Sequence, residues 1–485
     1  MVFNSAIFLV FSIFFFPIFY LSNLEKKKIV LLVFSYMFYM WAVPLHGLIL
    51  AYVTAICFIG YLGLEKSTND FQRKFLLVLF VPSLLAPLFF YKYLNFFSEQ
   101  LCSMFSCWEL FSTYSAYEIL LPIGISFYTF QSLSLFLDKY LYLDKQKYSF
   151  IEIAIFISFF PQLVAGPIER AKDIIPQFSS SFHFKFENLS QGLALFAAGM
   201  FGKVLVADNL STFVSNIYSD PTNFSGAYLL LSTYLFGLQI YFDFAGYSLM
   251  AIGIALTIGI NLSVNFNNPY GASSVKDFWR RWHITLGNWF KTYVYIPLGG
   301  NKSTLKIQLL SIMLVFTLSG FWHGANWTFI VWGICHAFGI MILSIVSTFV
   351  QNKPSISGIF VAPFLGIIVT NFFVFFCWIF FRANDLADAL NIIDSIGDTN
   401  FSKFFTTEFW GDVVSLSGRI SYNFYVALLA GVCLHVRQML FPSFSAITWL
   451  KTRTPAIHGL IAYVIIISIL FFGNLTNQSF IYFQF

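Results

Sequence analysis

The sequence has little charge for its length. Only 10% of its 485 residues are Asp, Glu, Lys or Arg, whereas about a quarter of the residues of a soluble domain are charged. So few charges cannot cover the surface of a water-soluble globule, and they also exclude a coiled coil and a disordered chain. The net charge of +5 is small and gives no reason to expect a nucleic-acid partner.

Cysteine is scarce as well. The six cysteines lack the CxxC and histidine spacing of a metal site, so we predict no bound metal. They are also too few for a secreted disulfide scaffold. Cys102 and Cys107 share one loop, where they would form a disulfide only in an oxidising compartment. The sequence leaves their pairing open.

Hydrophobic residues, by contrast, make up 58% of the chain, and the mean hydropathy is +0.76. An α-helix needs about 20 apolar residues to cross a bilayer core of ~30 Å. We therefore predict an all-α polytopic membrane protein with about 11–12 transmembrane helices. Because no repeat or soluble segment interrupts the chain, residues 1–485 are expected to form a single domain. The candidate spans lie near 3–22, 29–43, 46–63, 75–96, 120–137, 188–206, 227–260, 307–321, 325–349, 361–381, 421–436 and 459–473.

Three apolar stretches depart from a simple span. The run 150–166 contains helix breakers and has basic residues on both sides, which indicates a re-entrant segment buried in protein. The run 227–260 is long for one crossing, and we expect a kink or break near Asp243. The run 307–349 is interrupted at SGFWHGANW.

Loop charges predict which side of the membrane each loop occupies. Cytoplasmic loops are rich in Lys and Arg, and the stretches 139–172 and 276–306 hold five and six bases. The stretches 97–119 and 383–412 are acidic and are placed outside. Alternating the spans puts both termini outside the cytoplasm.

Histidines in apolar surroundings are the strongest candidate functional residues, because ionisable groups at membrane depth usually mark a site. His323 lies among small residues between Trp322 and Trp327, which would wall a pocket. His283 lies in an amphipathic interfacial segment, and His336 in an apolar helix. A buried neutral imidazole suits a general base. The alternative is structural histidines that hydrogen-bond between helices.

Other polar residues also lie in apolar runs, namely Gln131, Gln162, Gln239, Tyr241, Asp243 and Tyr247. Hydrogen bonding between helices is the default role for such residues. A carboxylate costs more to bury than an amide or a phenol. Asp243 is therefore the member of this group most expected to have a function.

Eight stretches, met in order along the chain, resemble the membrane-bound O-acyltransferase family, in particular its bacterial branch with the alginate and peptidoglycan O-acetyltransferase membrane subunits. They make 121–485 the core that resembles the family and 1–120 additional N-terminal spans. The stretches are LPIGISFYTFQSLS, FFPQLVAGPIER, GKVLVADNL, LQIYFDFAGYS, FWRRWHITLGNWFKTYVYIPLGGN, SGFWHGANW, FFRA and FIYFQF.

The resemblance implies a ring of helices around a central funnel, with His323 as the essential histidine and His283 as the second functional one. It implies acetyl-CoA as a cytoplasmic donor substrate and no permanently bound cofactor. Arg280, Arg281 and Lys291 would bind the CoA phosphates, since Arg in particular pairs well with phosphate. The other expected donor-binding or funnel-lining residues are Trp282, Asn288, Gln239, Tyr241, Asp243, Trp322, Asn326 and Trp327.

The last six residues, FIYFQF, are almost all apolar, and such a segment is expected to be buried rather than exposed. Related systems use an aromatic C-terminal motif whose tyrosine relays an acyl group. Tyr482 is therefore predicted to accept acetyl and pass it to a periplasmic acetyl-transferring partner protein. The alternative is a segment that only packs.

Together these observations predict a membrane O-acetyltransferase that serves O-acetylation of a cell-envelope polysaccharide, with peptidoglycan favoured over alginate. Two alternatives stay open. One is a proton-coupled transporter, although no inverted repeat is apparent. The other is a non-catalytic membrane scaffold for a periplasmic acetyltransferase.

Overall fold

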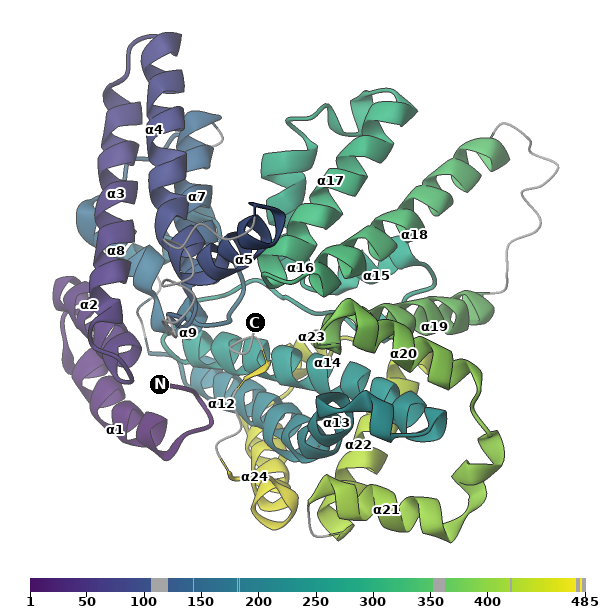
Figure 1. The fold of residues 1–485 in the computed structure, drawn as a ribbon. Coiled ribbons are helices and arrows are strands. Elements are labelled where there is room, and N and C mark those ends of the chain that lie inside the picture. The colour runs from purple at the N-terminus through teal and green to yellow at the C-terminus, as the bar shows by residue number, and fades with distance from the viewer. Residues whose placement is uncertain are drawn as a thin grey trace. The chain divides into compact units, whose positions relative to one another are not determined.

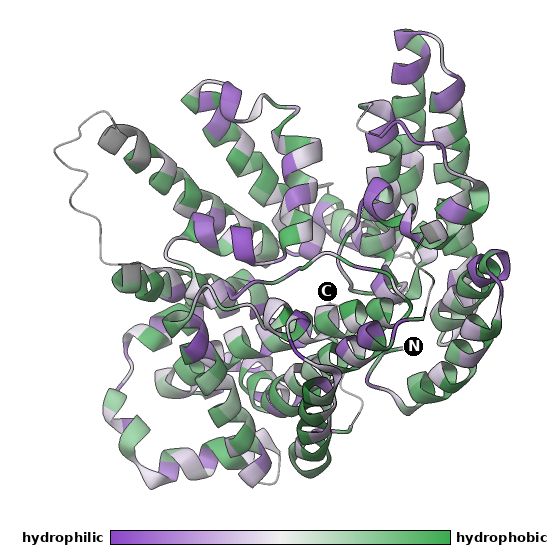
Figure 2. Ribbon diagram, turned by 180° about the vertical axis from the view of Figure 1, so that it is seen from behind, coloured by the Kyte–Doolittle hydropathy of each residue, from purple (hydrophilic) through white to green (hydrophobic). Residues whose placement is uncertain are grey.

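The described part of the computed structural model is helical, with turns and loops between the helices and no strand (Figure 1). Figure 2 shows hydrophobic residues along the long helices and hydrophilic residues mostly near their ends. The predicted all-helical membrane fold is therefore confirmed over these residues. The structure describes residues 1–105, 121–142, 144–180, 182, 184–351, 363–418, 421–476 and 480–481.

Nine helices in this described part are long and apolar enough to cross a membrane. The apolar run 3–22 forms a shorter helix, α1 (Ala6–Leu21), of 16 residues. The run 120–137 likewise forms a 16-residue helix, α7 (Ile125–Tyr140). The nine candidate spans are His46–Lys66, Asp70–Leu101, Phe186–Ser219, Gly226–Thr257, Leu305–His323, Trp327–Val346, Phe364–Arg382, Tyr422–Leu440 and Pro455–Phe472.

The chain divides into two compact units. The first contains Met1–Gly192 and Ala251–Ser263, and the second contains Leu193–Met250 and Val264–Phe485. Helix α14 (Gly226–Thr257) contributes to both. The single domain and the ring of helices around a funnel stay predictions.

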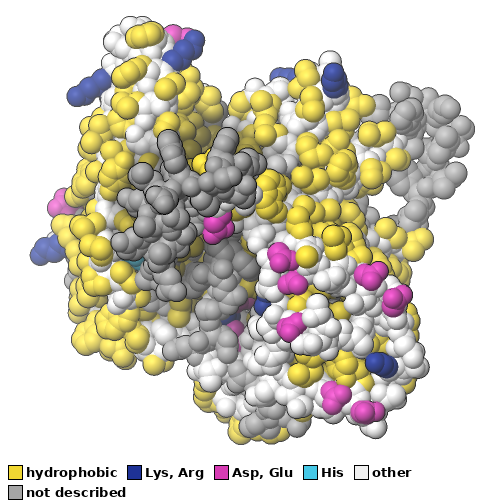
Figure 3. All heavy atoms as spheres, viewed as in Figure 1, with side chains coloured by type: hydrophobic (Ala, Val, Ile, Leu, Met, Phe, Trp, Pro, Cys, Tyr) yellow, Lys and Arg dark blue, Asp and Glu magenta, His cyan; other side chains and the backbone are white. Residues whose placement is uncertain are grey.

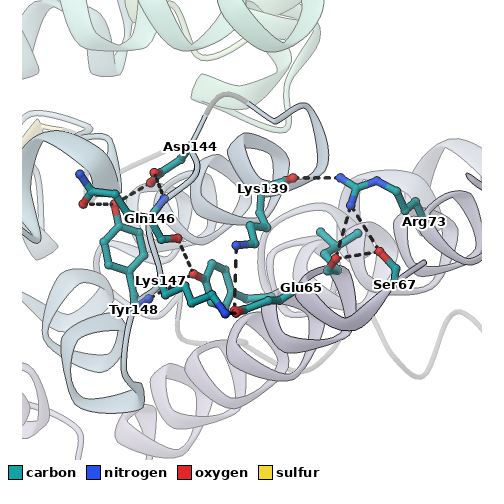
Figure 4. A network of polar contacts seen from close by, with 10 residues as sticks. Glu65, Ser67, Arg73, Lys139, Asp144, Gln146, Lys147 and Tyr148 are labelled. Carbon is teal, nitrogen blue, oxygen red and sulfur yellow. Dashed lines mark hydrogen bonds and ion pairs between the residues drawn. The ribbon is translucent and has the colours of Figure 1, made fainter. Parts of the chain in front are cut away.

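The first unit contains eleven described helices before residue 186. Polar side chains of this unit form hydrogen bonds and ion pairs between the ends of neighbouring helices. Arg73 on α4 donates to the backbone carbonyls of Lys139 and Tyr140 at the end of α7, at 3.0 and 2.6 Å. On α3, Glu65 pairs with Lys147 at 2.7 Å (Figure 4). The helices are α1, α2 (Leu24–Met40), α3 (His46–Lys66), α4 (Asp70–Leu88), η1 (Phe89–Tyr93), α5 (Leu94–Phe105), α7, α8 (Phe150–Ser158), α9 (Phe160–Leu163), α10 (Ala171–Ile174) and α11 (Gln177–Ser180).

The run 150–166 is broken into two helices, and the re-entrant path predicted for it stays a prediction. Two short helices of 9 and 4 residues, α8 and α9, replace one span. The carbonyl of Phe156 near the end of α8 accepts hydrogen bonds from the side-chain amides of Gln131 and Gln162, both at 2.8 Å. These amides satisfy a backbone group near the helix break, which is what a buried interruption requires.

Helices α17 (Leu305–His323) and α18 (Trp327–Gln351) lie side by side in the second unit (Figure 1). A Cβ atom at Gly320 would lie 2.2 Å from the carbonyl oxygen of Phe329, and one at Gly333 would lie 2.2 Å from that of Phe316. Only glycine permits this approach, as is usual where membrane helices pack closely. The chain breaks between the two helices at the predicted motif.

The break expected near Asp243 is absent, because α14 is one continuous helix of 32 residues. The carboxylate of Asp243 pairs with Lys203 at 2.7 Å. Gly246 provides a close contact with the backbone of Gly199. Asp243 therefore has an ion-pair partner, and Gly246 a packing partner, without any break in α14.

Among the remaining elements of the second unit, exposed acidic residues gather on α20 and α21 (Figure 3). These acids belong to the stretch 383–412, whose periplasmic side stays a prediction. The other elements are α12 (Phe186–Met200), η2 (Phe201–Ala207), α13 (Asp208–Ser219), η3 (Pro221–Asn223), η4 (Pro269–Gly271), α15 (Val275–Arg281), α16 (Ile284–Phe290), η5 (Lys291–Tyr295), η6 (Gly300–Lys302), α19 (Pro363–Arg382), α20 (Leu386–Gly397), η8 (Phe401–Phe405), α21 (Thr407–Ser417), α22 (Ser421–Leu440), α23 (Ala446–Lys451) and α24 (Pro455–Phe472).

Candidate active site

The structure brings together the two histidines predicted to be functional. His323 is the last residue of α17, and His283 stands between α15 and α16. Both are buried, at 3% and 1% exposure, and their ring centroids lie 6.5 Å apart. The ring of Trp322 lies 4.9 Å from that of His323 and 6.0 Å from that of His283. The two imidazoles therefore share one site with a predicted tryptophan.

His283 has a backbone conformation that is rare for its residue type. Its φ and ψ are 43° and 52°, in the left-handed region, and such geometry in a residue other than glycine often accompanies a functional constraint. Asn265 maintains it, because its carbonyl accepts the N–H of Ile284 at 3.0 Å. Its side-chain oxygen accepts from the backbone and hydroxyl of Thr285. The left-handed turn aims the imidazole into the buried site.

The same Asn265 oxygen lies 3.2 Å from Nδ1 of His283. Because this oxygen also accepts the N–H of Thr285, it is an acceptor, and Nδ1 must carry the proton. The lone pair of the neutral ring is then on Nε2. Burial lowers the pKa of His283 to about 3, so the imidazole is neutral at physiological pH.

Aromatic side chains enclose His323. Trp332 on α18 presents its ring at right angles, with centroids 5.1 Å apart, and the ring of Phe381 on α19 lies at 5.3 Å. Both are buried. These rings limit the rotamers of the imidazole and exclude water from its flank, so the ring has a defined orientation in an apolar setting.

A pocket of about 430 Å³ is lined by neighbours of this pair, although neither histidine is among its lining residues. Its rim includes Lys276, Arg280 and Lys291, and its wall includes Ile284 and Ser319. Ile284 directly follows His283 in the chain. Ser319 precedes His323 by four residues and so lies on the same face of α17, one turn away. The predicted Asn288 also lines the pocket.

Adjacent basic residues on α15 have different surroundings. Arg280 is exposed at the pocket. Arg281 instead pairs with Asp277 at 3.0 Å and donates to the carbonyl of Pro442 at 2.7 Å. Trp282 is buried against Trp378, with ring centroids 5.0 Å apart. Of these three, the structure places only Arg280 where it can reach a ligand in this pocket.

The remaining predicted residues lie in several places. The side-chain amide of Asn326 donates to the carbonyl of Asn384, and its oxygen accepts at the start of α18. Trp327 is 47% exposed. Gln239 is buried on α14, and Tyr241 packs its ring against Trp282 at 6.2 Å. None of these four is among the residues that line the basic pocket.

His336, whose role the sequence left open, belongs to the packing around the pocket. Its Nδ1 accepts from the indole N–H of Trp279 at 3.2 Å, and Trp279 lines the pocket. The imidazole is fully buried on α18. It therefore joins α15 to α18 and holds one wall in place.

Asp243 is close to the chain terminus as well as to Lys203. Its second carboxylate oxygen accepts the backbone N–H of Ile481 at 2.7 Å. Ile481 and Phe480 are buried, at 3% and 2% exposure. Tyr482, the predicted acetyl acceptor, lies outside the described residues, as does Cys107, whose pairing with Cys102 the sequence left open. Two of the six C-terminal residues are thus seen packed against α14.

Sequence reasoning missed two residues that shape the site, Asn265 and Lys203. Asn265 lies in a polar loop, where asparagine usually signals an ordinary turn. Lys203 had a usable signal, because a lysine inside an apolar run calls for a buried anion, and Asp243 was the best one available. Among the described residues, no group of three or more His, Cys, Asp or Glu side chains could hold a metal ion.

A buried pair of histidines beside a cation-lined pocket, in a multi-pass membrane protein, suits proton transfer to and from a bound ligand. A family model described as membrane-bound O-acyltransferase matches residues 104–386. The chain belongs to the membrane-bound O-acyltransferase family. The resemblance of its motifs is confirmed, and the protein is an O-acyltransferase.

Individual relatives agree with this assignment. The chain is 33% identical over 412 residues to the peptidoglycan O-acetyltransferase of Helicobacter pylori, covering 79% of this chain and 76% of that protein. It is 37% identical over 395 residues to the probable alginate O-acetylase AlgI of Azotobacter vinelandii, covering 80% and 76%. It is 30% identical to the teichoic acid D-alanyltransferase of Bacillus subtilis over 227 residues, covering 44% and 57%.

Proposed function

We propose that the protein moves an acetyl group from cytoplasmic acetyl-CoA across the inner membrane for O-acetylation of a cell-envelope polysaccharide, with peptidoglycan the favoured acceptor. The observation that carries the proposal is the pair of buried imidazoles, 6.5 Å apart, next to a pocket with a basic rim. The names of two similar proteins, one acting on peptidoglycan and one on alginate, support the acceptor class.

The basic rim favours CoA as the donor. Three cationic side chains, Lys276, Arg280 and Lys291, line the pocket, and cations of this kind pair with phosphate groups. The positive-inside rule puts these residues in the cytoplasm, where acetyl-CoA is present. The nucleotide would occupy the rim, and the pantetheine arm would carry the thioester toward His323.

The first chemical step acetylates Tyr482. His323 takes the phenolic proton as the oxygen attacks the thioester carbonyl, so a C–O bond forms. The C–S bond then breaks, and the CoA thiolate takes the proton from the imidazolium. His283 presents an acceptor at Nε2, so it orients a hydroxyl and does not polarise a carbonyl. Charge and atoms balance without a further reactant.

The second step releases the acetyl group on the other side of the membrane. A periplasmic partner protein supplies a hydroxyl that attacks the acetyl-tyrosine, and the phenol is regenerated when the partner is acetylated. The partner then passes acetyl to the polysaccharide. With both termini periplasmic, Tyr482 is on the side where this partner works.

The test is acetyl transfer by the purified protein in nanodiscs. Incubation with acetyl-CoA should add one acetyl group to Tyr482, located by peptide mass spectrometry. His323→Ala and Tyr482→Phe should both prevent it. An unmodified wild-type chain together with an active Tyr482→Phe protein would rule out the relay. Normal polysaccharide acetylation in a His323→Ala strain would instead favour a non-catalytic scaffold.

A further inference from the structure

Three buried ionic side chains form a triplet that the transfer steps do not use. Nζ of Lys203 lies 2.8 Å from Asp208 and 2.7 Å from Asp243, and each side chain is only 3% exposed. Buried charges are costly unless every oxygen and proton has a partner. The triplet has one cation and two carboxylates, so further donors are needed to satisfy the oxygens.

Close backbone packing brings Lys203 to Asp243. A Cβ atom at Gly199 would lie 2.4 Å from the carbonyl oxygen of Gly246, and one at Gly246 would lie 2.7 Å from that of Gly199. Lys203 itself is in the π-helical turn η2, a kind of distortion that is frequent at functional sites. The approach of α12 to α14 therefore sets the direction of the ammonium group.

The second oxygen of Asp243 is committed to the C-terminal segment. It accepts the backbone N–H of Ile481 at 2.7 Å. The preceding Phe480 packs its ring against Tyr247 and Phe244, with centroids 5.1 and 5.9 Å apart. Asp243 and Phe244 lie four and three residues before Tyr247, so each is one turn from it, and the three contacts fall on the part of α14 around Tyr247.

That face also meets the histidine pair. The ring of Phe244 lies 4.7 Å from the ring of His283, nearly perpendicular to it. Phe244 thus packs against Phe480 on one side and His283 on the other. The segment that leads to Tyr482 is fixed within one side chain of the site.

We propose that Asp243, oriented by Lys203, is a positioning residue that holds the C-terminal segment through the Ile481 N–H and so presents Tyr482 to the histidines. The proposal rests on the proposed function, because it takes Tyr482 as the acetyl carrier. Asp243 contacts the backbone amide of Ile481, so the contact fixes the path of the chain. It does not depend on which side chain residue 481 carries.

The first experiment removes only the amide proton. Ile481→Pro lacks the N–H, and Ile481→Val keeps it with a similar apolar side chain. Neither change substitutes Lys203, Asp208 or Asp243. Acetylation of Tyr482 should fall about 10- to 100-fold in the proline variant, as expected for the loss of a hydrogen bond to a charged group. The valine variant should match the wild type in transfer and in unfolding temperature. The proline variant leaves an oxygen of Asp243 without this donor, so it should unfold at a somewhat lower temperature, and transfer is measured well below both transitions.

The second experiment follows the segment itself. Hydrogen exchange by mass spectrometry, on the protein in nanodiscs, should show faster exchange of the Ile481 amide in Asp243→Asn, by about 10-fold. Asp398→Asn changes an exposed acid and should leave exchange and transfer unaltered. Unchanged exchange at Ile481 in Asp243→Asn would overturn the positioning role.

Failure of the two proposals can be told apart. If Tyr482→Phe is inactive while Ile481→Pro transfers acetyl as well as Ile481→Val, the relay holds and the positioning role is wrong. If Tyr482→Phe is fully active, the relay is wrong. The proposal that Asp243 positions Tyr482 is then wrong as well. Slow transfer in Ile481→Pro, with normal transfer in Ile481→Val and both measured well below their unfolding temperatures, supports the positioning role, because a segment that only packs would tolerate the loss of one amide proton.

Discussion

His283 and His323 lie with their ring centroids 6.5 Å apart, although 39 residues separate them in the sequence. One ends a long apolar helix, and the other follows a short amphipathic helix in a left-handed turn. Asn265 fixes the tautomer of His283, whereas aromatic rings surround His323. The two rings therefore differ in chemistry. His283 has its lone pair fixed on Nε2, whereas His323 lies in an apolar environment.

The first prediction concerns His323. Replacing it by alanine should lower acetyl transfer by about 100- to 10,000-fold, the usual range for loss of a general base. The measurement is the rate of acetyl incorporation from labelled acetyl-CoA. His458→Gln is the matched control, because His458 is a buried histidine on α24 that bonds the carbonyl of Leu450 at 2.9 Å. Equal activity of both variants would exclude His323 from the chemistry.

The second prediction concerns Asn265 and uses pH as the readout. Asn265→Asp places a carboxylate beside Nδ1 of His283, which raises the pKa of the imidazole from about 3, because an opposite charge favours the imidazolium. Transfer should then be lost at a higher pH than in the wild type as the pH falls. Asn265→Leu should lower the rate about 10- to 100-fold without this displacement, as removal of an orienting partner does. Superimposable pH profiles for wild type and Asn265→Asp would contradict the assigned tautomer.

Much of the helix pattern could be predicted from the sequence, because bilayer thickness fixes helix length and leaves few alternatives. The interruption between α17 and α18 was also predictable, since small and polar residues in SGFWHGANW stop an apolar run. A kink or break was expected near Asp243, and the continuous helix α14 excludes a break at Asp243. Its charge is paired across helices with Lys203 at 2.7 Å, and sequence spacing alone cannot reveal such a pair.

The candidate site shows the same limit. The importance of a histidine in an apolar run follows from the cost of burying it, but its partner depends on tertiary structure. Arg280 and Arg281 look equivalent in sequence. They differ because successive residues on a helix point about 100° apart. Only the tertiary structure reveals that the guanidinium of Arg281 already binds Asp277 and the carbonyl of Pro442.

The third prediction separates these two arginines. Arg280→Ala and Lys291→Ala should each raise the KM for acetyl-CoA about 3- to 10-fold with little change in kcat, because both line the pocket and exposed cations are partly screened. The effect should shrink as salt is added. Lys306→Ala removes the same charge from an exposed position of α17 outside the pocket lining and should leave KM unchanged. A KM change for Arg281→Ala larger than for Arg280→Ala would contradict this placement of the donor.

The fourth prediction concerns stability and pH in the first unit. Glu169 is 3% exposed, and burial raises its pKa to about 7, against the hydrogen bonds from Ser263 that lower it. Since the folded-state value exceeds the unfolded value of 4.5, the folded chain binds more protons between about pH 4.5 and 7. Glu169 therefore contributes stability at low pH that is lost as the pH rises through this window.

Glu169→Gln should remove that loss. Its amide oxygen can still accept the backbone N–H of Ser263, and the amide N–H can donate to the Ser263 hydroxyl, so both contacts of the carboxyl survive. The variant should be more stable than the wild type at pH 8, by up to about 3 kcal/mol, and similar to it at pH 4. Thermal unfolding in detergent at the two pH values measures the difference. A variant that is less stable at both would mean that the charged carboxylate is the form the fold requires.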